Sequence, residues 1–147
     1  MNMHTPKWRA RFLEVAATVA KWSKDPTTKV GCVIISPKGL IISTGYNGIP
    51  RGVEDKPERM ERPAKYLFLS HAEQSAIANA ARHGSKTEGA TMFVTHQPCS
   101  HCARQIINAG IVAVVCGDGT TSMPHEEFVA SRQMLHEAGV SLICEAG

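Results

Sequence analysis

The sequence predicts an α/β fold of three layers, in which helices cover both faces of a central five-stranded mixed sheet. Three observations predict it. Segments with helical and with strand-like hydrophobic spacing alternate in the second half of the chain, which is typical of parallel strands joined by right-handed crossovers. Residues 111–116 form a nearly continuous apolar run, as buried parallel strands do. Earlier, two β-branched runs flank a Pro/Gly turn, so an antiparallel hairpin makes the sheet mixed.

The first expected element is a helix over residues 8–22, where apolar residues recur at intervals of three and four and the segment Ser23-Lys24-Asp25-Pro26 then breaks the pattern. A polar stretch over residues 46–65, rich in Pro, Gly and charge, is expected to be a functional or mobile loop. The remaining elements follow from periodicity and from glycines after the helices. They are strands at 30–35, 40–43, 90–95, 111–116 and 140–144, and helices at 72–82, 100–109 and 126–137.

Length and composition predict one ordinary globular domain over residues 1–147. Apolar residues at 43% and charged residues at 20% argue against disorder, collagen and coiled coil. No apolar run approaches the about 18 residues of a membrane span, and the first residues lack the apolar stretch of a signal peptide, so we expect a cytoplasmic protein with no membrane partner. The net charge of +3, without a Lys/Arg run, suits an anionic small molecule better than nucleic acid.

Five cysteines, an odd number without a secretion signal, argue against a disulfide framework. Cys32, Cys116 and Cys144 each lie in an apolar run and are expected to be buried thiols. Cys99 and Cys102 stand instead at a predicted helix start, in the segment Pro98-Cys99-Ser100-His101-Cys102. Cys99 and Cys102 are therefore the cysteines that we consider as metal ligands or as a redox pair.

A second cluster, His71-Ala72-Glu73, also opens a predicted helix. His71, Cys99 and Cys102 together supply three zinc ligands and leave a fourth position open for water, as in catalytic zinc sites. Two cysteines three residues apart on a first helical turn face the same way, and the helix N-terminus favours their thiolate forms.

Glu73 is the candidate general acid–base, because zinc lowers the pKa of bound water to about 7 and a carboxylate beside it can move the proton. A redox pair of Cys99 and Cys102 is the alternative, but it gives His71 and Glu73 no role. His101 is expected to be exposed, and the remaining histidines to be surface or loop residues, with a second metal site among them left open. The order H-x-E…P-C-x-x-C is the signature of zinc nucleobase deaminases.

With both clusters in place, the chain resembles the deoxycytidylate (dCMP) deaminase family, of the cytidine-deaminase-like fold, over about Trp22 to Val140. The resemblance also rests on two further segments. These are Ser23-Lys24-Asp25-Pro26-Thr27-Thr28-Lys29-Val30-Gly31 and Thr44-Gly45-Tyr46-Asn47-Gly48-Ile49-Pro50-Arg51-Gly52. The Gly-Tyr-Asn-Gly-x-Pro loop separates this branch from tRNA adenosine deaminases and riboflavin-pathway deaminases.

The resemblance implies hydrolysis of dCMP and water to dUMP and ammonia, feeding dTMP synthesis, with Zn²⁺ on the three ligands and Glu73 as proton shuttle. It also implies that Asn47 contacts the sugar and that Arg51 reaches the phosphate, for which a guanidinium is suited. The implied partners are a nucleotide substrate, dCTP and dTTP as effectors, and further copies of the chain in a dimer or hexamer.

Two departures leave the substrate open. Ser75, a third candidate substrate contact, stands where relatives often carry Asn, and residues 117–124 lack the Tyr-containing acidic stretch of many relatives. The alternatives are a zinc deaminase of 5-substituted dCMP, dCTP, a nucleoside or tRNA adenosine, or a non-catalytic zinc nucleotide-binding module. Glu73 argues against the module, because a structural metal site needs no proton shuttle.

Overall fold

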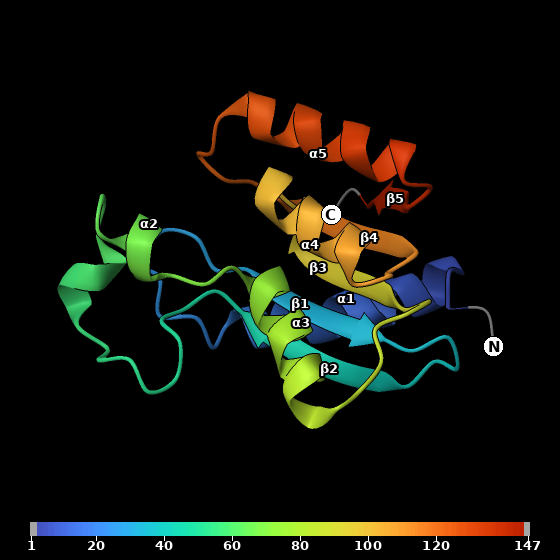
Figure 1. Ribbon diagram of the computed structural model, residues 1–147, viewed down its shortest axis with the longest axis horizontal. Coiled ribbons are helices and arrows are strands. Elements are labelled where there is room, and N and C mark those ends of the chain that lie inside the picture. The colour runs from blue at the N-terminus through green and yellow to red at the C-terminus, as the bar shows by residue number, and fades with distance from the viewer. Residues whose placement is uncertain (1–2, 146–147) are drawn as a thin grey trace.

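The computed structural model describes residues 3–145, whose strands form one five-stranded sheet in the order β2-β1-β3-β4-β5 (Figure 1). The first strand, β1 (Gly31–Ile35), pairs antiparallel with both β2 (Ile41–Tyr46) and β3 (Thr91–His96). Then β3, β4 (Ala113–Gly119) and β5 (Ser141–Cys144) run parallel. The sheet is mixed, as a hairpin followed by alternating strands and helices predicts.

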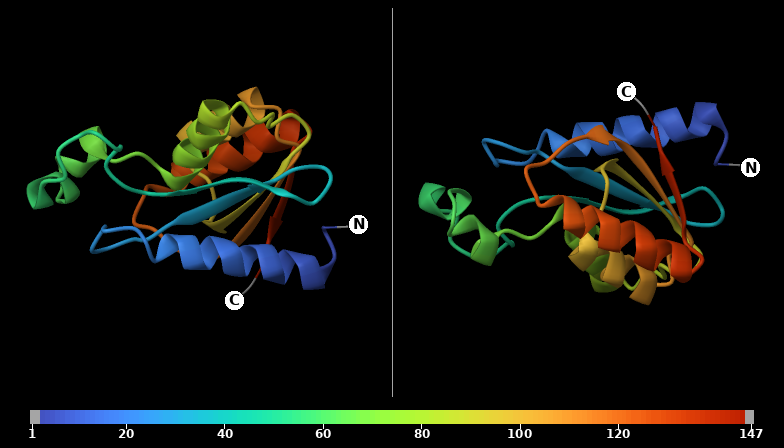
Figure 2. Two further views of the ribbon diagram at one scale, coloured as in Figure 1. Left: turned by 90° about the horizontal axis from the view of Figure 1, so that it is seen from below. Right: turned by 90° about the horizontal axis from the view of Figure 1, so that it is seen from above.

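Helices cover both faces of this sheet (Figure 2). Helix α1 (Pro6–Ala20) packs on one face. Helices α3 (Ala72–His83), α4 (Ser100–Asn108) and α5 (His125–Glu137) lie on the other. The predicted three-layer α/β/α fold is confirmed.

The central strands are buried on both faces, which explains their continuous apolar runs. In β1, Cys32 and Ile34 pack in the cluster under α3, α4 and α5, while Val33 and Ile35 pack in the cluster under α1. Alternate side chains of a strand point to opposite faces, so one apolar strand serves two cores.

Two glycines let helices approach the sheet closely. A Cβ atom on Gly31 would lie 1.9 Å from the carbonyl oxygen of Ala16 in α1. A Cβ atom on Gly45 would lie 2.4 Å from the carbonyl oxygen of Ala72 in α3. The second contact seats the N-terminal turn of α3 on β2.

The helices and strands begin and end within a few residues of their predicted positions. Helix α1 begins at Pro6, before the predicted start, because Thr5 caps it by accepting the N–H of Trp8 at 3.4 Å. Strands β2 and β4 run past their predicted ends, because Tyr46 and Gly119 still pair with neighbouring strands. Among residues 3–145, the helices are all too short or too polar to cross a membrane.

The polar segment predicted as a loop contains a short 3₁₀ helix, η1 (Pro57–Met60), and leads into a one-turn helix, α2 (Lys65–Phe68). Four residues are too few to show a helical period, so the sequence did not indicate α2. Both short helices stand away from the sheet (Figures 1 and 2). The segment that follows them pairs Ser70 with Gly48, so the residues before His71 lie beside the C-terminal end of β2.

One of the three predicted buried thiols is exposed. Cys32 and Cys116 are buried, as predicted, but the prediction for Cys144 is wrong. Its strand, β5, lies at the edge of the sheet, where it has β4 as a neighbour on one side only. The apolar run around Cys144 therefore belongs to an edge strand with a partly covered surface.

Candidate metal centre and adjoining cavity

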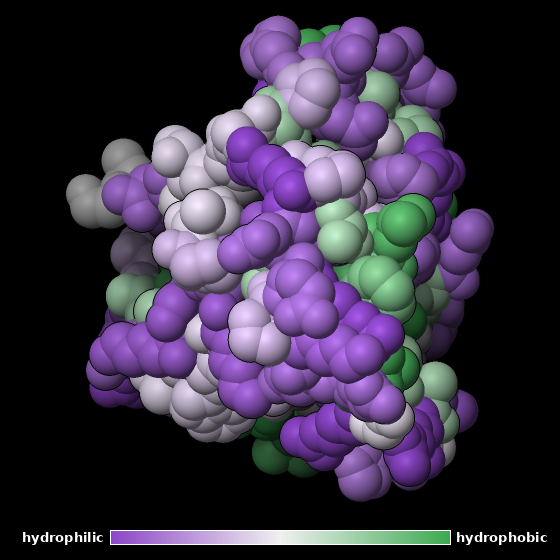
Figure 3. All heavy atoms as spheres, turned by 90° about the vertical axis from the view of Figure 1, so that its left-hand side faces the viewer, coloured by the Kyte–Doolittle hydropathy of each residue, from purple (hydrophilic) through white to green (hydrophobic). Residues whose placement is uncertain are grey.

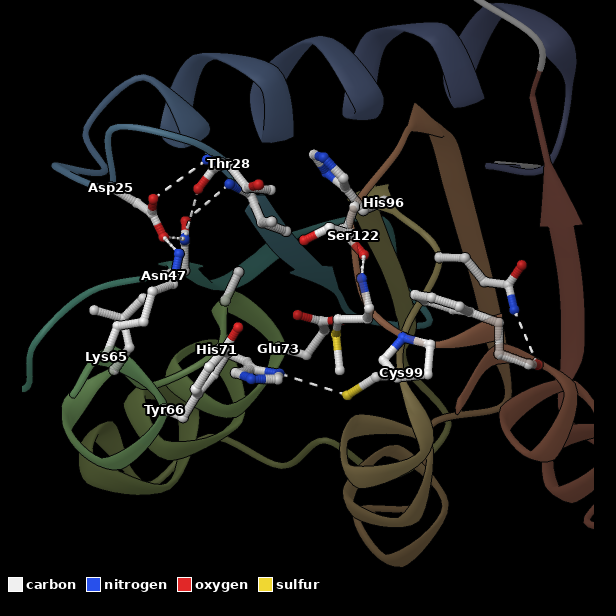
Figure 4. A pocket seen from close by; sticks show the side chains of 18 of the residues that line it. Asp25, Thr28, Asn47, Lys65, Tyr66, His71, Glu73, His96, Cys99 and Ser122 are labelled. Atoms are coloured by element: carbon white, nitrogen blue, oxygen red, sulfur yellow. Dashed lines mark hydrogen bonds and ion pairs between the residues drawn. The ribbon is translucent and has the colours of Figure 1, made fainter. Parts of the chain in front are cut away.

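The structure brings His71, Cys99 and Cys102 together. Their ligand atoms all lie within 4.8 Å of one another. The Nδ1 atom of His71 is 3.5 Å from Sγ of Cys99 (Figure 4). The same Nδ1 atom is 3.3 Å from Sγ of Cys102. A tetrahedral zinc ion, with bonds of about 2.3 Å to sulfur and about 2.0 Å to nitrogen, separates such atoms by about 3.5 Å. The donor set and its spacing therefore fit zinc.

Two helix N-termini position these ligands. His71 is the N-cap of α3, and Gln74 holds it there by accepting the His71 backbone N–H at 2.8 Å. Cys99 is the N-cap of α4, and Cys102 lies in the first turn of the same helix. Because both helices pack on the same face of the sheet, side chains 28 residues apart along the chain meet.

A carboxylate from a third helix fixes the start of α4. Glu127 of α5 accepts hydrogen bonds from the Ser100 hydroxyl at 2.7 Å and from the Ser100 backbone N–H at 3.3 Å. Ser100 directly follows Cys99, so this contact orients the turn that carries both cysteines. Negative charge at a helix N-terminus also stabilises the helix.

Protonation in the cluster follows from its contacts. Hydrogen bonds from Cys102 and His71 lower the pKa of Cys99 to about 4, so its thiolate is favoured. The hydrogen bond to Cys99 raises the pKa of His71, while hydrogen bonding to Cys99 and burial raise the pKa of Cys102. A metal ion bound here would displace the protons that these groups share.

Glu73 lies in the first turn of α3 and is only 5% exposed. Burial raises the pKa of its carboxyl group to about 7. In Figure 4 its side chain lies between His71 and Cys99, at the wall of a cavity. A carboxyl group that ionises near neutral pH beside a metal site can both accept and donate a proton.

The cavity has a volume of about 290 Å³, at the lower end of the usual range for small-molecule sites. His71, Glu73 and Cys99 line one part of it, and a polar group lines another (Figure 4). In that polar group, the buried Lys65 donates to the buried Asp25 at 3.0 Å.

Asn47, a predicted substrate contact, also lines the cavity. Its Oδ1 atom accepts the N–H of Val30 at 2.8 Å, and its Nδ2 atom donates to the carbonyl of Thr28 at 2.9 Å. These bonds tie the Asn47 loop to the segment before β1. They also set the orientation of the amide at the cavity wall.

The structure does not bring the other two predicted substrate contacts to this cavity. Arg51 and Ser75 line a separate hollow, together with Arg82 and His83. The Ser75 hydroxyl instead bonds to that of Ser70 at 3.3 Å. As predicted, His101 is exposed.

Several cavity residues were not indicated by the sequence. Lys65 and Arg62 come from the polar segment expected to be a loop, and Thr121 and Ser122 from the loop after β4. His96, expected to be a surface or hydrogen-bonded loop residue, lies at the end of β3, is half-buried and lines the cavity as well. No periodicity or motif separates these residues from solvated neighbours, so only the path of the loops reveals them.

Comparisons with known proteins point the same way as the geometry. Residues 6–118 match the family model described as the cytidine and deoxycytidylate deaminase zinc-binding region, which confirms the prediction of zinc. The chain is 43% identical over 139 residues to an uncharacterized deaminase in the luxG 3′ region of Aliivibrio fischeri, covering 92% of both chains. It is 35% identical over 141 residues to human deoxycytidylate deaminase, covering 92% of this chain and 78% of that protein.

Solved structures share the fold. The chain superposes on the apo crystal structure of dCMP deaminase from the cyanophage S-TIM5 with a TM-score of 0.78 and 25% identity, covering 96% of this chain and 99% of that one. It also superposes on a tRNA:A34 deaminase with a TM-score of 0.63 and 22% identity, covering 95% and 98% of the two chains. The second likeness concerns the fold alone.

Proposed function

Because the chain belongs to the cytidine and deoxycytidylate deaminase family, whose model matches residues 6–118, we propose that it is a zinc-dependent hydrolase that converts dCMP and water to dUMP and ammonia. The observation that carries this proposal is the buried carboxyl of Glu73 beside the His71, Cys99 and Cys102 cluster, at the wall of a cavity. The similarity to human deoxycytidylate deaminase over 92% of the chain favours dCMP among the substrates of the family.

We assign His71, Cys99 and Cys102 as the zinc ligands. When bound, zinc supplies a Lewis acid that makes a water molecule nucleophilic near neutral pH. The His71 imidazole and the Cys99 and Cys102 sulfurs would hold the ion, and a site with three protein ligands has a position left for that water. Cys102 and Cys99 are buried, so their sulfur atoms are largely shielded from bulk solvent.

Glu73 moves the protons in this proposal. It accepts a proton from the water as the water oxygen bonds to C4 of the cytosine ring, and it delivers that proton to ring N3. The second water proton goes to the exocyclic nitrogen as the bond from C4 to this nitrogen breaks, and ammonia leaves. The buried position of Glu73 keeps its carboxyl within the cavity rather than in bulk water.

Asn47 remains our proposed sugar contact, because it lines the cavity and its amide is held by Val30 and Thr28. Arg51 and Ser75 line a separate hollow, so their position does not support a role as substrate contacts. We further propose a single deaminase domain over residues 1–147, located in the cytoplasm, whose product feeds dTMP synthesis. Assembly into a dimer or hexamer and control by dCTP and dTTP also remain predictions.

The test compares substrates with one preparation of the protein. Bound zinc is measured by metal analysis, the assembly state by light scattering, and ammonia release with dCMP, CMP, deoxycytidine, dCTP and 5-methyl-dCMP. Each substrate is assayed with and without dCTP or dTTP as effector. We expect stoichiometric zinc and the highest kcat/KM with dCMP. Faster turnover of another substrate would replace dCMP in the proposal, and absence of ammonia from every substrate would favour a non-catalytic binding module.

A further inference from the structure

We propose that Arg62 recognises the 5′-phosphate of the substrate, with help from the hydroxyl groups of Thr121 and Ser122. This inference rests on the proposed function, because only a nucleotide substrate brings a phosphate into the cavity. All three residues line the cavity that is also lined by Glu73, His71 and Cys99. They come from the polar segment before α2 and from the loop after β4.

The charges of the cavity single out Arg62. Lys65, the other strongly basic residue in the lining, is buried, and its Nζ atom donates to Asp25 at 3.0 Å and to the Thr27 hydroxyl at 3.2 Å. Its positive charge is therefore balanced by a carboxylate. Among residues 3–145, no carboxylate forms an ion pair with Arg62, whose side-chain hydrogen bond goes to the neutral Ser122 hydroxyl at 2.5 Å.

The two histidines that line the cavity, His71 and His96, are poorly placed to bind a phosphate. The Nδ1 atom of His71 faces the two sulfurs. Burial lowers the pKa of His96, which favours its neutral form, and its Nδ1 atom pairs with the Thr95 hydroxyl at 2.6 Å. Arg62 is thus the cation in this lining whose charge is available to a ligand.

The Ser122 hydroxyl contacts the Arg62 guanidinium, and the hydroxyl of the adjacent Thr121 lines the same cavity. The Ser122 oxygen accepts from Arg62, and the Thr121 oxygen accepts the backbone N–H of Met123 at 3.2 Å. Each hydroxyl hydrogen is then free to donate. A guanidinium binds phosphate through two parallel N–H donors, and hydroxyl donors complete such a site.

The position of Arg62 also suits a nucleotide lying across the cavity. Arg62 and Ser122 are exposed, whereas Glu73 and Cys99 are buried. A phosphate carries about two negative charges at neutral pH and is costly to bury, so it belongs at the exposed end while the base enters the buried end. Hydrophilic side chains predominate on the face of the molecule that includes the segment before α2 (Figure 3).

The test uses the purified zinc enzyme and the substitution Arg62→Gln. We expect the KM for dCMP to rise by about 10–100-fold with kcat largely retained, since a hydrogen-bonded charge is lost far from the reacting atoms. Affinity for dUMP should weaken in the same proportion, measured by calorimetry, while affinity for deoxyuridine should not change. Ser122→Ala should give a smaller effect of the same kind.

Arg59→Gln is the matched control, because it removes the same charge from the same segment, and Arg59 does not line the cavity. It should leave KM and both affinities unchanged. Arg51→Gln tests the alternative phosphate contact that the sequence suggested. Unchanged KM in Arg62→Gln, equal loss of deoxyuridine affinity, or a loss in Arg51→Gln instead would each overturn the inference.

The activity of the wild-type enzyme separates failure of the proposed function from failure of the Arg62 assignment. If the wild-type enzyme releases no ammonia from dCMP, the proposed function fails and takes this inference with it. If the wild-type enzyme deaminates dCMP and Arg62→Gln does so with the same KM, only the assignment of Arg62 fails.

Discussion

Glu73 differs from most glutamates in two ways: its side chain is buried, and it lies beside a candidate metal site. It is buried in the first turn of α3, and it lies two residues after His71, a proposed zinc ligand. Burial raises its pKa to about 7, within the range where a carboxyl group exchanges protons readily at neutral pH. A purely structural metal site would gain nothing from this costly placement, because burying a carboxyl group destabilises its charged form.

The substitution Glu73→Gln keeps the size of the side chain and removes its ability to accept a proton. We expect kcat for dCMP to fall by about 10²–10⁴-fold, the usual contribution of general acid–base catalysis. Zinc content should not change, because Glu73 is outside the set of grouped ligand atoms. Ammonia release and metal analysis on the same sample check both points, and a variant with wild-type turnover would remove Glu73 from the mechanism.

At the scale of elements, the site depends on how α3 and α4 meet the sheet and α5. Gly45 in β2 allows the start of α3 to lie against the strand, and Glu127 in α5 holds the start of α4. Each contact fixes the N-terminal turn that carries ligands. Helix packing thereby converts two sequence-distant turns into one site.

Gly45→Ala should destabilise the protein by about 1–3 kcal/mol or more, because the new Cβ atom would meet the Ala72 backbone, which cannot move aside as a flexible side chain can. Thermal unfolding of the zinc protein measures this. Gly48→Ala is the control, since a Cβ atom there makes an ordinary contact at 3.6 Å with the Tyr46 ring. Equal stability of the two variants would contradict the close seating of α3 on β2.

Glu127→Gln should lower the free energy of unfolding by about 1 kcal/mol. The substitution exchanges the hydrogen bonds from Ser100 to a carboxylate for weaker bonds to a neutral amide, and it removes a negative charge at the start of α4. We also expect faster loss of zinc to a chelator, since the turn holding Cys99 and Cys102 becomes less ordered. The neighbouring Glu126→Gln serves as control. Zinc retention like that of the control would show that α5 does not support the metal turn.

At the scale of the whole molecule, one buried ion pair ties together segments that form the cavity. Asp25 accepts the Lys65 ammonium at 3.0 Å and the N–H of Thr27 at 2.9 Å. Asn47 donates to Asp25 from a third segment at 3.4 Å. The loop after α1, the loop after β2 and α2 are joined at this point.

Asp25→Asn should destabilise the protein by about 3–5 kcal/mol, because it leaves the buried Lys65 charge without its partner. Burial alone would raise the pKa of Asp25, but hydrogen bonds from Thr27, Lys65 and Thr28 outweigh burial and lower it. A lowered folded-state pKa gives stability that is present above the unfolded value and is lost as the pH falls through the folded value.

The stability difference between wild type and Asp25→Asn should therefore shrink as the pH is lowered below the ordinary aspartate pKa of 3.8. Urea unfolding at a series of pH values measures it. A difference that stays constant down to the lowest pH at which the protein folds would show that the ion pair does not contribute through the Asp25 charge.

The sequence by itself determined the layered fold and the selection of His71, Glu73, Cys99 and Cys102. Periodicity is a local property, since neighbours three or four apart share a helix face and alternate residues share a strand face. Cys99 and Cys102 could be selected as ligand candidates because spacing within one helical turn restricts where their side chains point. His71 and Glu73 could be selected because they form a second cluster at a predicted helix start. Burial of Cys144 was wrongly predicted from the same kind of pattern, because local sequence does not reveal which strand lies at an edge.

Only the tertiary structure decided what surrounds the candidate metal ligands. Lys65 meets Asp25 from 40 residues away, and Arg62 meets Ser122 from 60 residues away, through loops without periodicity. Arg51, selected from its motif, lies in a different hollow. The path of an irregular loop is set by long-range contacts rather than by neighbouring residues, so, apart from Asn47, the polar lining of the cavity could not be assigned from the chain alone.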